Sequence, residues 1–113
     1  MITIYHNPRC RKSREALALV QQNTDSIQII EYLKETPSTE ELSRVVELLG
    51  IKPQELIRKG ESIFKENFKG KDLTDEGWID AMVAFPKLIE RPIVIHGSKA
   101  VVGRPPENVL TII

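Results

Sequence analysis

Cysteine is almost absent from this sequence, since Cys10 is the only one among 113 residues. A single cysteine excludes an intramolecular disulfide framework, so the chain is unlike small secreted scaffolds that disulfide bonds stabilise. One cysteine and two widely spaced histidines, His6 and His96, do not make the usual spacing of a zinc site. We therefore expect no metal centre. A glycine-rich phosphate loop is also missing.

Neither sign of charge dominates, because sixteen basic residues balance sixteen acidic ones. No global field then favours nucleic acid or an anionic membrane, and we expect neither as a partner. Any attraction for anions must come from local clustering. No apolar run approaches the ~18 residues of a membrane span, and no signal-peptide pattern opens the chain. We expect a soluble, cytoplasmic protein whose lone thiol stays reduced. No apolar stretch identifies an oligomeric interface.

The length fits one domain, residues 1–113, with one core. Its first part predicts strand, helix and strand, a unit that favours parallel pairing with a right-handed crossover. Its last part predicts a hairpin with a Gly97-Ser98 turn and then a helix, with Val109, Leu110 and Ile113 on one side. The expected elements are strand 2–5, helix 10–22, strand 27–32, strands 93–95 and 99–102, and a last helix from about Gly103.

The middle of the chain, about 34–90, predicts a helical insertion. Ser38 and Glu41 have the spacing of a capping box, and Gly50 ends that helix. A second, short helix is predicted from Pro53 to about Arg58–Gly60, and a third begins at an N-cap, Thr74. Residues 61–73 show no clear pattern, although Phe64 and Phe68 are placed to pin them to the body. The order β-α-β, helices, β-β-α predicts a four-stranded mixed sheet flanked by helices.

Cys10 lies where the first strand passes into the first helix, after the turn marked by Asn7-Pro8. The first N–H groups of a helix have no intrahelical partner and carry partial positive charge, which favours thiolate, the nucleophilic form. Most free cysteines are small buried hydrophobes. Here the neighbours are instead polar and basic: His6, Arg9, Arg11, Lys12, Ser13 and Arg14. We therefore predict a reactive thiol beside a site suited to an oxyanion.

Two side chains near Cys10 are candidates for a catalytic role. His6 is suited to lower the pKa of the thiol or to relay protons, but it is equally explained as a polar end of the strand. Ser13 lies one helical turn after Cys10, so its hydroxyl is placed to donate to the sulfur or to a bound oxyanion. A serine in place of a second cysteine prevents an internal disulfide, so an oxidised or adducted Cys10 must be resolved by an outside thiol.

Three arginines stand beside structure-breaking residues: Arg58, Arg91 and Arg104. Arginine offers a planar fork of donors to tetrahedral oxyanions. Spacing alone favours an ordinary surface role for each of them. Trp78 is better explained as a core or partner contact than as a cofactor platform, and His96 as a solvent-exposed residue beside the hairpin turn.

The run His6–Arg14 closely resembles the signature of the glutaredoxin-coupled arsenate reductases. Other landmarks occur in the same order: Thr36-Pro37, Leu56–Lys59, Arg91–Val94 and Gly103–Pro105. The resemblance covers essentially the whole chain. It implies a thioredoxin-like fold with the helical insertion between its two halves, and it identifies Pro92 as the cis-proline beside the active site.

The resemblance also implies a function. Cys10 matches the nucleophile of the family, and Arg58, Arg91 and Arg104 match the arginines that bind arsenate. Arsenate would be reduced to arsenite through a covalent adduct on Cys10, which glutathione, as co-substrate, and a glutaredoxin resolve. No bound cofactor is expected.

Two alternatives remain open at this stage. The Cys10 loop is also similar to that of Spx-type transcription regulators, which bind RNA polymerase. Those regulators have a Cys-x-x-Cys switch, which Ser13 removes here. A thiol oxidoreductase acting on glutathione mixed disulfides is the third possibility, because it too needs a thiolate and cations that bind anions.

Overall fold

The computed structural model describes residues 1–113, which divide into two compact units. Unit 1 comprises Met1–Glu35 and Arg91–Ile113, and unit 2 comprises Thr36–Glu90. None of the helices combines the length and the apolar character that crossing a membrane requires. The assignment of residues 1–113 to one domain, with an insertion at about 34–90, stays a prediction.

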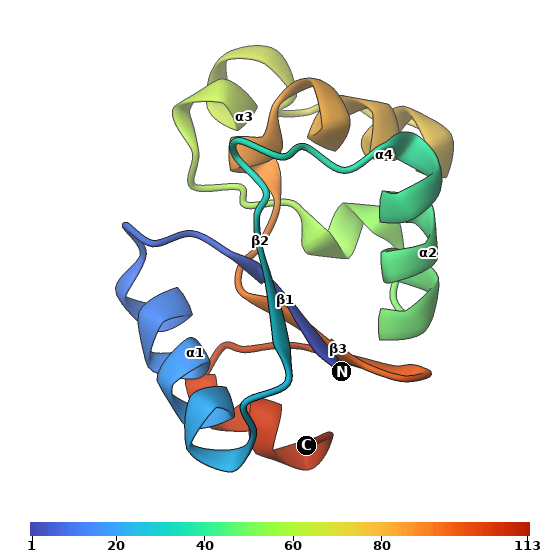
Figure 1. The fold of residues 1–113 in the computed structure, drawn as a ribbon. Coiled ribbons are helices and arrows are strands. Elements are labelled where there is room, and N and C mark those ends of the chain that lie inside the picture. The colour runs from blue at the N-terminus through green and yellow to red at the C-terminus, as the bar shows by residue number, and fades with distance from the viewer. The chain divides into compact units, whose positions relative to one another are not determined.

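Unit 1 is built on a four-stranded mixed sheet, which confirms the predicted fold class (Figure 1). The strands lie in the order β2-β1-β3-β4, with bounds β1 Ile2–His6, β2 Ile27–Glu31, β3 Ile93–His96 and β4 Lys99–Val102. β1 pairs in parallel with β2, as a strand-helix-strand unit requires, and antiparallel with β3. β3 and β4 form the predicted hairpin around Gly97, whose φ is +64°.

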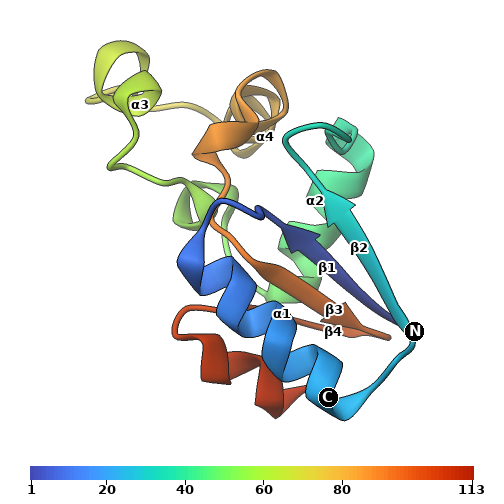
Figure 2. The same ribbon diagram turned by 60° about the vertical axis from the view of Figure 1, so that its left-hand side comes forward.

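One face of this sheet is covered by α1 (Arg11–Asn23) and by the C-terminal 3₁₀ helix η3 (Pro106–Thr111), which lie side by side in Figure 2. Their contacts with β1 and β3 form an apolar cluster. Its buried members are Ile2, Ile4, Ala16, Val20, Val94 and Val109. The packing holds the start of α1, and therefore Cys10, against the carboxyl end of β1.

The prediction for the C-terminal helix was wrong in one respect. Leu110 was expected on the apolar side, but it is exposed. A 3₁₀ helix has three residues per turn, so Val109 and Ile112 face the core while Leu110 points away. The side chain of Asn108 stabilises the element by donating to the carbonyls of Val102 and Arg104, both at 3.2 Å.

Gly103 lies where the chain packs closely against Pro92, Ala16 and Val109, and its replacement tests this packing. A Cβ at this buried position would lie 2.9 Å from Pro92 Cγ, 3.2 Å from Ala16 Cβ and 3.3 Å from Val109 Cγ1. We expect Gly103→Ala to lower the free energy of unfolding by about 1–3 kcal/mol, the usual cost of overpacking. Urea denaturation measures this loss. Gly60→Ala is the matched control, because a Cβ there meets nothing within 4 Å; equal stabilities of the two variants would contradict the packing.

Unit 2 begins with α2 (Thr39–Leu49), which confirms both predicted end signals. Ser38 Oγ accepts the N–H of Glu41 at 3.1 Å, and Glu41 Oε1 accepts the N–H of Ser38 at 3.3 Å. Gly50 ends the helix in the left-handed conformation, with φ +68°. The buried face of α2 carries Leu42, Val45 and Val46, as the helical spacing predicted.

The rest of unit 2 consists of short helices: η1 (Pro53–Leu56), α3 (Ser62–Asn67), α4 (Asp75–Ala84) and η2 (Pro86–Leu88). Thr74 caps α4 through its Oγ1, which accepts the N–H of Gly77 at 3.1 Å, as predicted. The helix predicted to end at about Arg58–Gly60 instead ends at Leu56, because Ile57 turns into an isolated β-bridge with Ile89. Helix α3 was not predicted.

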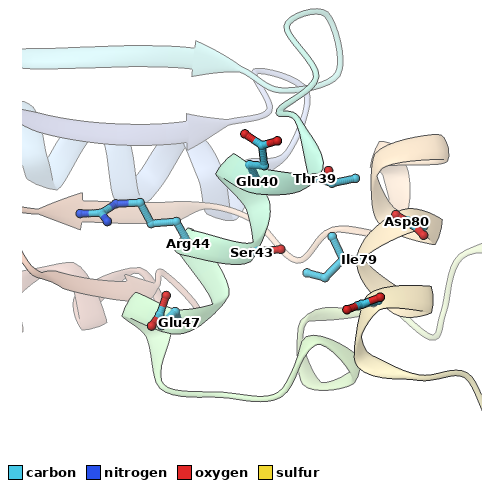
Figure 3. Close-up of a pocket in the computed structure, with 8 residues that line it drawn as sticks. Thr39, Glu40, Ser43, Arg44, Glu47, Ile79 and Asp80 are labelled. Carbon is cyan, nitrogen blue, oxygen red and sulfur yellow. The ribbon is translucent and has the colours of Figure 1, made fainter.

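Two features of unit 2 matter below. Phe64 and Phe68 pack on Trp78, with ring centroids 6.4 Å and 6.1 Å apart, which confirms that they pin the segment 61–73. Helices α2 and α4 border an open groove of about 500 Å³ (Figure 3). Acidic side chains make up half of its lining, and we call it the acidic groove. Its charged residues are Glu40, Arg44, Glu47, Glu76 and Asp80.

Candidate active site

Cys10 occupies the N-cap position of α1, with an extended backbone. The loop that leads to it is closed by two hydrogen bonds to Asn7. The N–H of Cys10 donates to the carbonyl of Asn7, and the N–H of Arg9 donates to Asn7 Oδ1, both at 3.0 Å. No acidic residue lies in the first turn of α1. No carboxylate of the first turn therefore opposes an anion at the positive end of the helix.

The electrostatics at Cys10 support the predicted reactive thiol. Burial raises the pKa of the thiol, but the backbone N–H of Ser13, the side chain of Arg91 and the backbone N–H of Lys12 lower it, and their effect prevails. Arg91 acts both as a hydrogen-bond donor and as a charge. Thiolate is therefore more populated near neutral pH than for an ordinary cysteine, and thiolate is the attacking form.

His6 and Ser13 form a buried pair beside the loop. Ser13 Oγ lies 2.6 Å from His6 Nδ1 and also accepts the N–H of Asn7 at 3.0 Å. Ser13 is fully buried, and His6 and Asn7 nearly so. The hydroxyl thus links the end of β1 to the first turn of α1. It is the backbone N–H of Ser13, not the predicted hydroxyl, that donates to the sulfur.

The Ser13 hydroxyl gives a stability prediction. Ser13→Ala leaves the Asn7 N–H and His6 Nδ1 without this buried partner, and an unsatisfied buried polar group costs about 1–3 kcal/mol. We expect the free energy of unfolding to fall by that amount, measured by chemical denaturation. Ser43→Ala, at an exposed position of α2, is the matched control and should change stability little. Wild-type stability of Ser13→Ala would contradict a structural role for the hydroxyl.

A pH dependence follows from His6. Burial lowers the pKa of His6, and the positive charge of Arg14 lowers it further. The negative charge of Glu31 raises the pKa, but burial prevails, so the pKa of His6 lies below its ordinary value. The unfolded chain then binds the proton more readily, and stability should fall as pH drops through about 6.5, the unfolded value. We expect His6→Asn to reduce this fall in the free energy of unfolding, whereas the control His96→Asn should retain it. Identical pH profiles for the two variants would contradict the assignment.

Three of the four basic side chains nearest Cys10 in sequence have other partners. Arg11 Nε lies 3.0 Å from Glu15 Oε1, and its side chain is 83% exposed. Lys12 Nζ lies 3.9 Å from the other oxygen of Glu15. Arg14 Nη1 donates to the carbonyl of Pro8 at 3.0 Å and so ties the loop to α1. These contacts fit helix-surface pairing and loop support.

Two of the three predicted arginines lie in unit 1, next to cis-prolines. The Arg91-Pro92 bond is cis, as the family resemblance implied, and so is the Arg104-Pro105 bond, which was not predicted. Arg104 Nη1 donates to the carbonyl of Arg91 at 3.3 Å, and the N–H of Gly103 donates to the carbonyl of Pro92 at 2.8 Å. The structure thus brings Arg91 to the Cys10 sulfur and connects Arg104 to Arg91.

Arg58 lies in unit 2, between two carboxylates. Its Nε is 3.4 Å from Glu90 Oε1, and its Nη1 is 3.7 Å from Glu61 Oε1. The backbone N–H of Arg58 donates to the carbonyl of Leu88 at 2.7 Å. These contacts orient a half-buried guanidinium. The arsenate-binding role of Arg58 stays a prediction from the resemblance.

Sequence reasoning missed one residue of the site, Asn7. It was noted only as a turn former, yet it bonds the chain at three points: its carbonyl, its side-chain oxygen and its N–H. An asparagine just before a proline favours such a turn, so the signal was present in the sequence. What the sequence did not show is that the N–H of Asn7 bonds the hydroxyl of Ser13.

Comparison with known proteins identifies the family. The ArsC family model matches residues 5–112. An arsenate reductase of Haemophilus influenzae is 44% identical, over 99% of this chain and 98% of that protein. The uncharacterized protein YfgD of Escherichia coli is also 44% identical, over 99% and 96% of the two chains.

A solved structure gives the same result in three dimensions. The arsenate reductase from Vibrio cholerae is 46% identical and superposes with a TM-score of 0.94, covering 99% of this chain and 97% of that one. This likeness extends the agreement from the Cys10 loop to the whole thioredoxin-like fold. The chain belongs to the ArsC family.

Proposed function

We propose that this protein reduces arsenate to arsenite, with Cys10 as the nucleophile. The observation that carries the proposal is the thiol itself, a cysteine at a helix N-terminus. Backbone N–H groups and Arg91 lower the pKa of this thiol. The named arsenate reductases that share 44% and 46% of its residues support the choice of substrate. We place the reaction in the cytoplasm, where a lone thiol stays reduced.

Arsenate is a tetrahedral anion, and the start of α1 suits it. Free N–H groups at a helix N-terminus bind such anions, and arginine forks add charge-assisted hydrogen bonds. In our proposal Arg91 and Arg104 bind arsenate beside Cys10, and Arg58 joins them, as the family resemblance implies. The N–H groups of Lys12 and Ser13, which bond the sulfur, would also stabilise charge that develops on arsenate oxygens.

The first chemical step forms a covalent adduct. The Cys10 thiolate attacks arsenic, and a sulfur–arsenic bond forms. One hydroxyl of arsenate takes up a proton and leaves as water, while arsenic stays in oxidation state V. Arg91, released from the thiolate, would then neutralise an arsenate oxygen.

The second step needs a thiol from outside, because Cys10 is the only cysteine. The sulfur of glutathione attacks the Cys10 sulfur, a disulfide bond forms, and the sulfur–arsenic bond breaks with its electron pair passing to arsenic. Arsenic gains two electrons and leaves as arsenite, and the two sulfurs lose them. A glutaredoxin thiolate then removes glutathione from the mixed disulfide and restores Cys10. The scheme requires no bound cofactor.

A coupled assay tests this proposal. The purified protein is incubated with arsenate, glutathione and glutaredoxin, and arsenite is quantified; a parallel reaction replaces arsenate with a glutathione mixed disulfide of a small thiol. We expect arsenite to form in proportion to the protein added. Reduction of the mixed disulfide with no arsenite from arsenate would instead assign the protein to the thiol oxidoreductases.

A further inference from the structure

Unit 2 carries a second groove, of about 550 Å³, bordered by α3, the loop after it and α4. Its lining combines two kinds of side chain that are otherwise scattered along the chain, namely lysines and aromatic rings. We call it the lysine groove. Its lysines are Lys59, Lys65, Lys69 and Lys71, and its rings are Phe64, Phe68 and Trp78.

The three rings form one wall of the groove. Trp78 is buried, with 2% of its surface exposed. Phe64 lies nearly parallel to it, at an interplanar angle of 24°, and Phe68 is tilted by 48°. Both phenylalanines are only half-buried. Ring surface is therefore available to a ligand in the groove, while Trp78 fixes the rings from behind.

The lysines of the groove have no counter-charge. All four are exposed, and the ion pairs of the structure join other residues. No acidic residue lines the groove. Lys71 Nζ lies 5.8 Å from the centroid of the Phe68 ring, so one ammonium already contacts the aromatic wall. The groove therefore offers concentrated positive charge beside flat apolar surface.

Negative charge is concentrated in a different groove of unit 2. The acidic groove between α2 and α4 has four carboxylates and one arginine (Figure 3). A polyanion is repelled there and attracted to the lysine groove. The balanced net charge of the chain conceals this separation, which explains why composition alone gave no anionic partner.

We propose that the lysine groove binds a nucleoside polyphosphate. Lysine ammonium groups bind phosphates as point charges, and nucleobases stack on aromatic side chains. The volume lies within the 300–1,000 Å³ range of small-molecule sites. An acidic protein segment would meet the same charges, but lysine is depleted in protein–protein interfaces, whereas lysine with exposed aromatic rings is typical of nucleotide contacts. This site is independent of the arsenate chemistry at Cys10.

The single tryptophan supplies the measurement, because Trp78 lines the groove and no other tryptophan contributes emission. The full-length protein is titrated with ATP, with inorganic tripolyphosphate, with adenosine and with a hexadeoxyadenylate, and calorimetry checks each affinity. We expect ATP to bind at least about tenfold more tightly than tripolyphosphate or adenosine. If tripolyphosphate binds as tightly as ATP, the base contributes nothing and the groove is only a positively charged patch. Stronger binding of the oligonucleotide than of ATP would assign it to single-stranded nucleic acid, and either result overturns the proposal.

Variants separate charge from stacking. The triple variant Lys65→Gln, Lys69→Gln, Lys71→Gln should weaken ATP binding about tenfold or more. The control triple variant Lys52→Gln, Lys87→Gln, Lys99→Gln removes the same charge from exposed positions outside the groove and should leave the affinity unchanged.

Phe64→Leu should weaken the affinity for ATP but leave the affinity for tripolyphosphate unchanged. Calorimetry gives the affinities of these variants independently of their emission. Equal ATP affinities for the two lysine variants, or no ATP binding by the wild type, would overturn the proposal.

Discussion

Replacing Cys10 with serine is expected to reduce arsenate reduction at least about a thousandfold, because the chain has no other thiol to form the adduct. Serine is close to cysteine in size, but its hydroxyl stays protonated at neutral pH and forms no disulfide with glutathione. The measurement is arsenite formed per protein in the glutathione and glutaredoxin assay.

The control for this variant is its fold. Cys10 contributes no side-chain cap to α1, so serine there should leave thermal unfolding close to that of the wild type. Cys10→Ala is a second variant, because alanine has no hydroxyl that could form a new N-cap hydrogen bond as serine could. Undiminished arsenate reduction by either folded variant would eliminate Cys10 as the nucleophile.

Arg91→Ala is the second large effect that we expect. Removal of the side chain deletes a hydrogen bond and a positive charge at the sulfur, so the pKa of Cys10 should rise. Arsenate turnover should fall roughly hundredfold, the usual cost of one donor that stabilises developing charge. Alkylation of Cys10 by iodoacetamide near neutral pH should slow as well, because less thiolate is present. Arg11→Ala, at an exposed helix position, is the matched control and should change neither rate.

The pH dependence separates the two roles of Arg91. At a pH above the thiol pKa of both proteins, the thiolate is fully formed and alkylation rates should converge. A deficit in arsenate turnover that persists there measures the contribution of Arg91 to the oxyanion. Complete recovery of turnover at high pH would confine Arg91 to setting the pKa of Cys10.

Much of the fold was predictable because its signals are local. The capping box of Ser38 and Glu41, the glycine that ends α2 and the two-residue hairpin turn each depend on a few neighbouring residues. The parallel pairing of β1 with β2 followed from the rule that a strand-helix-strand unit pairs in parallel. These features need no knowledge of distant contacts.

The elements that sequence reasoning missed lack such signals. Helix α3 has six residues, none of them buried, so no apolar period marks it; its neighbours hold it through Phe64 and Phe68 on Trp78. In η3 the 3₁₀ winding decides which residues face the core, and Leu110 is exposed as a result. Short apolar runs do not distinguish a period of 3 from one of 3.6.

In the candidate active site, too, the features with local sequence signals were predictable and those that depend on distant contacts were not. Cys10 was identified from its place at a helix start and from its polar neighbours, which all lie within four positions of it in the sequence. The contact between Arg91 and the sulfur joins opposite ends of the chain, so spacing could not predict it, and only the family resemblance indicated Arg91. The pairing of His6 with Ser13 was missed because it depends on how the loop between them folds back, which the sequence pattern does not show.

The central claim is that arsenate is reduced through a covalent adduct on Cys10 that glutathione resolves. Its most direct test is intact mass spectrometry of the protein after incubation with arsenate and glutathione, without glutaredoxin and without oxidised glutathione. The mechanism predicts one glutathionyl group on Cys10 for each arsenite released, and no such group when arsenate is omitted. Arsenite formed while Cys10 stays unmodified, or glutathionylation that does not depend on arsenate, would contradict it.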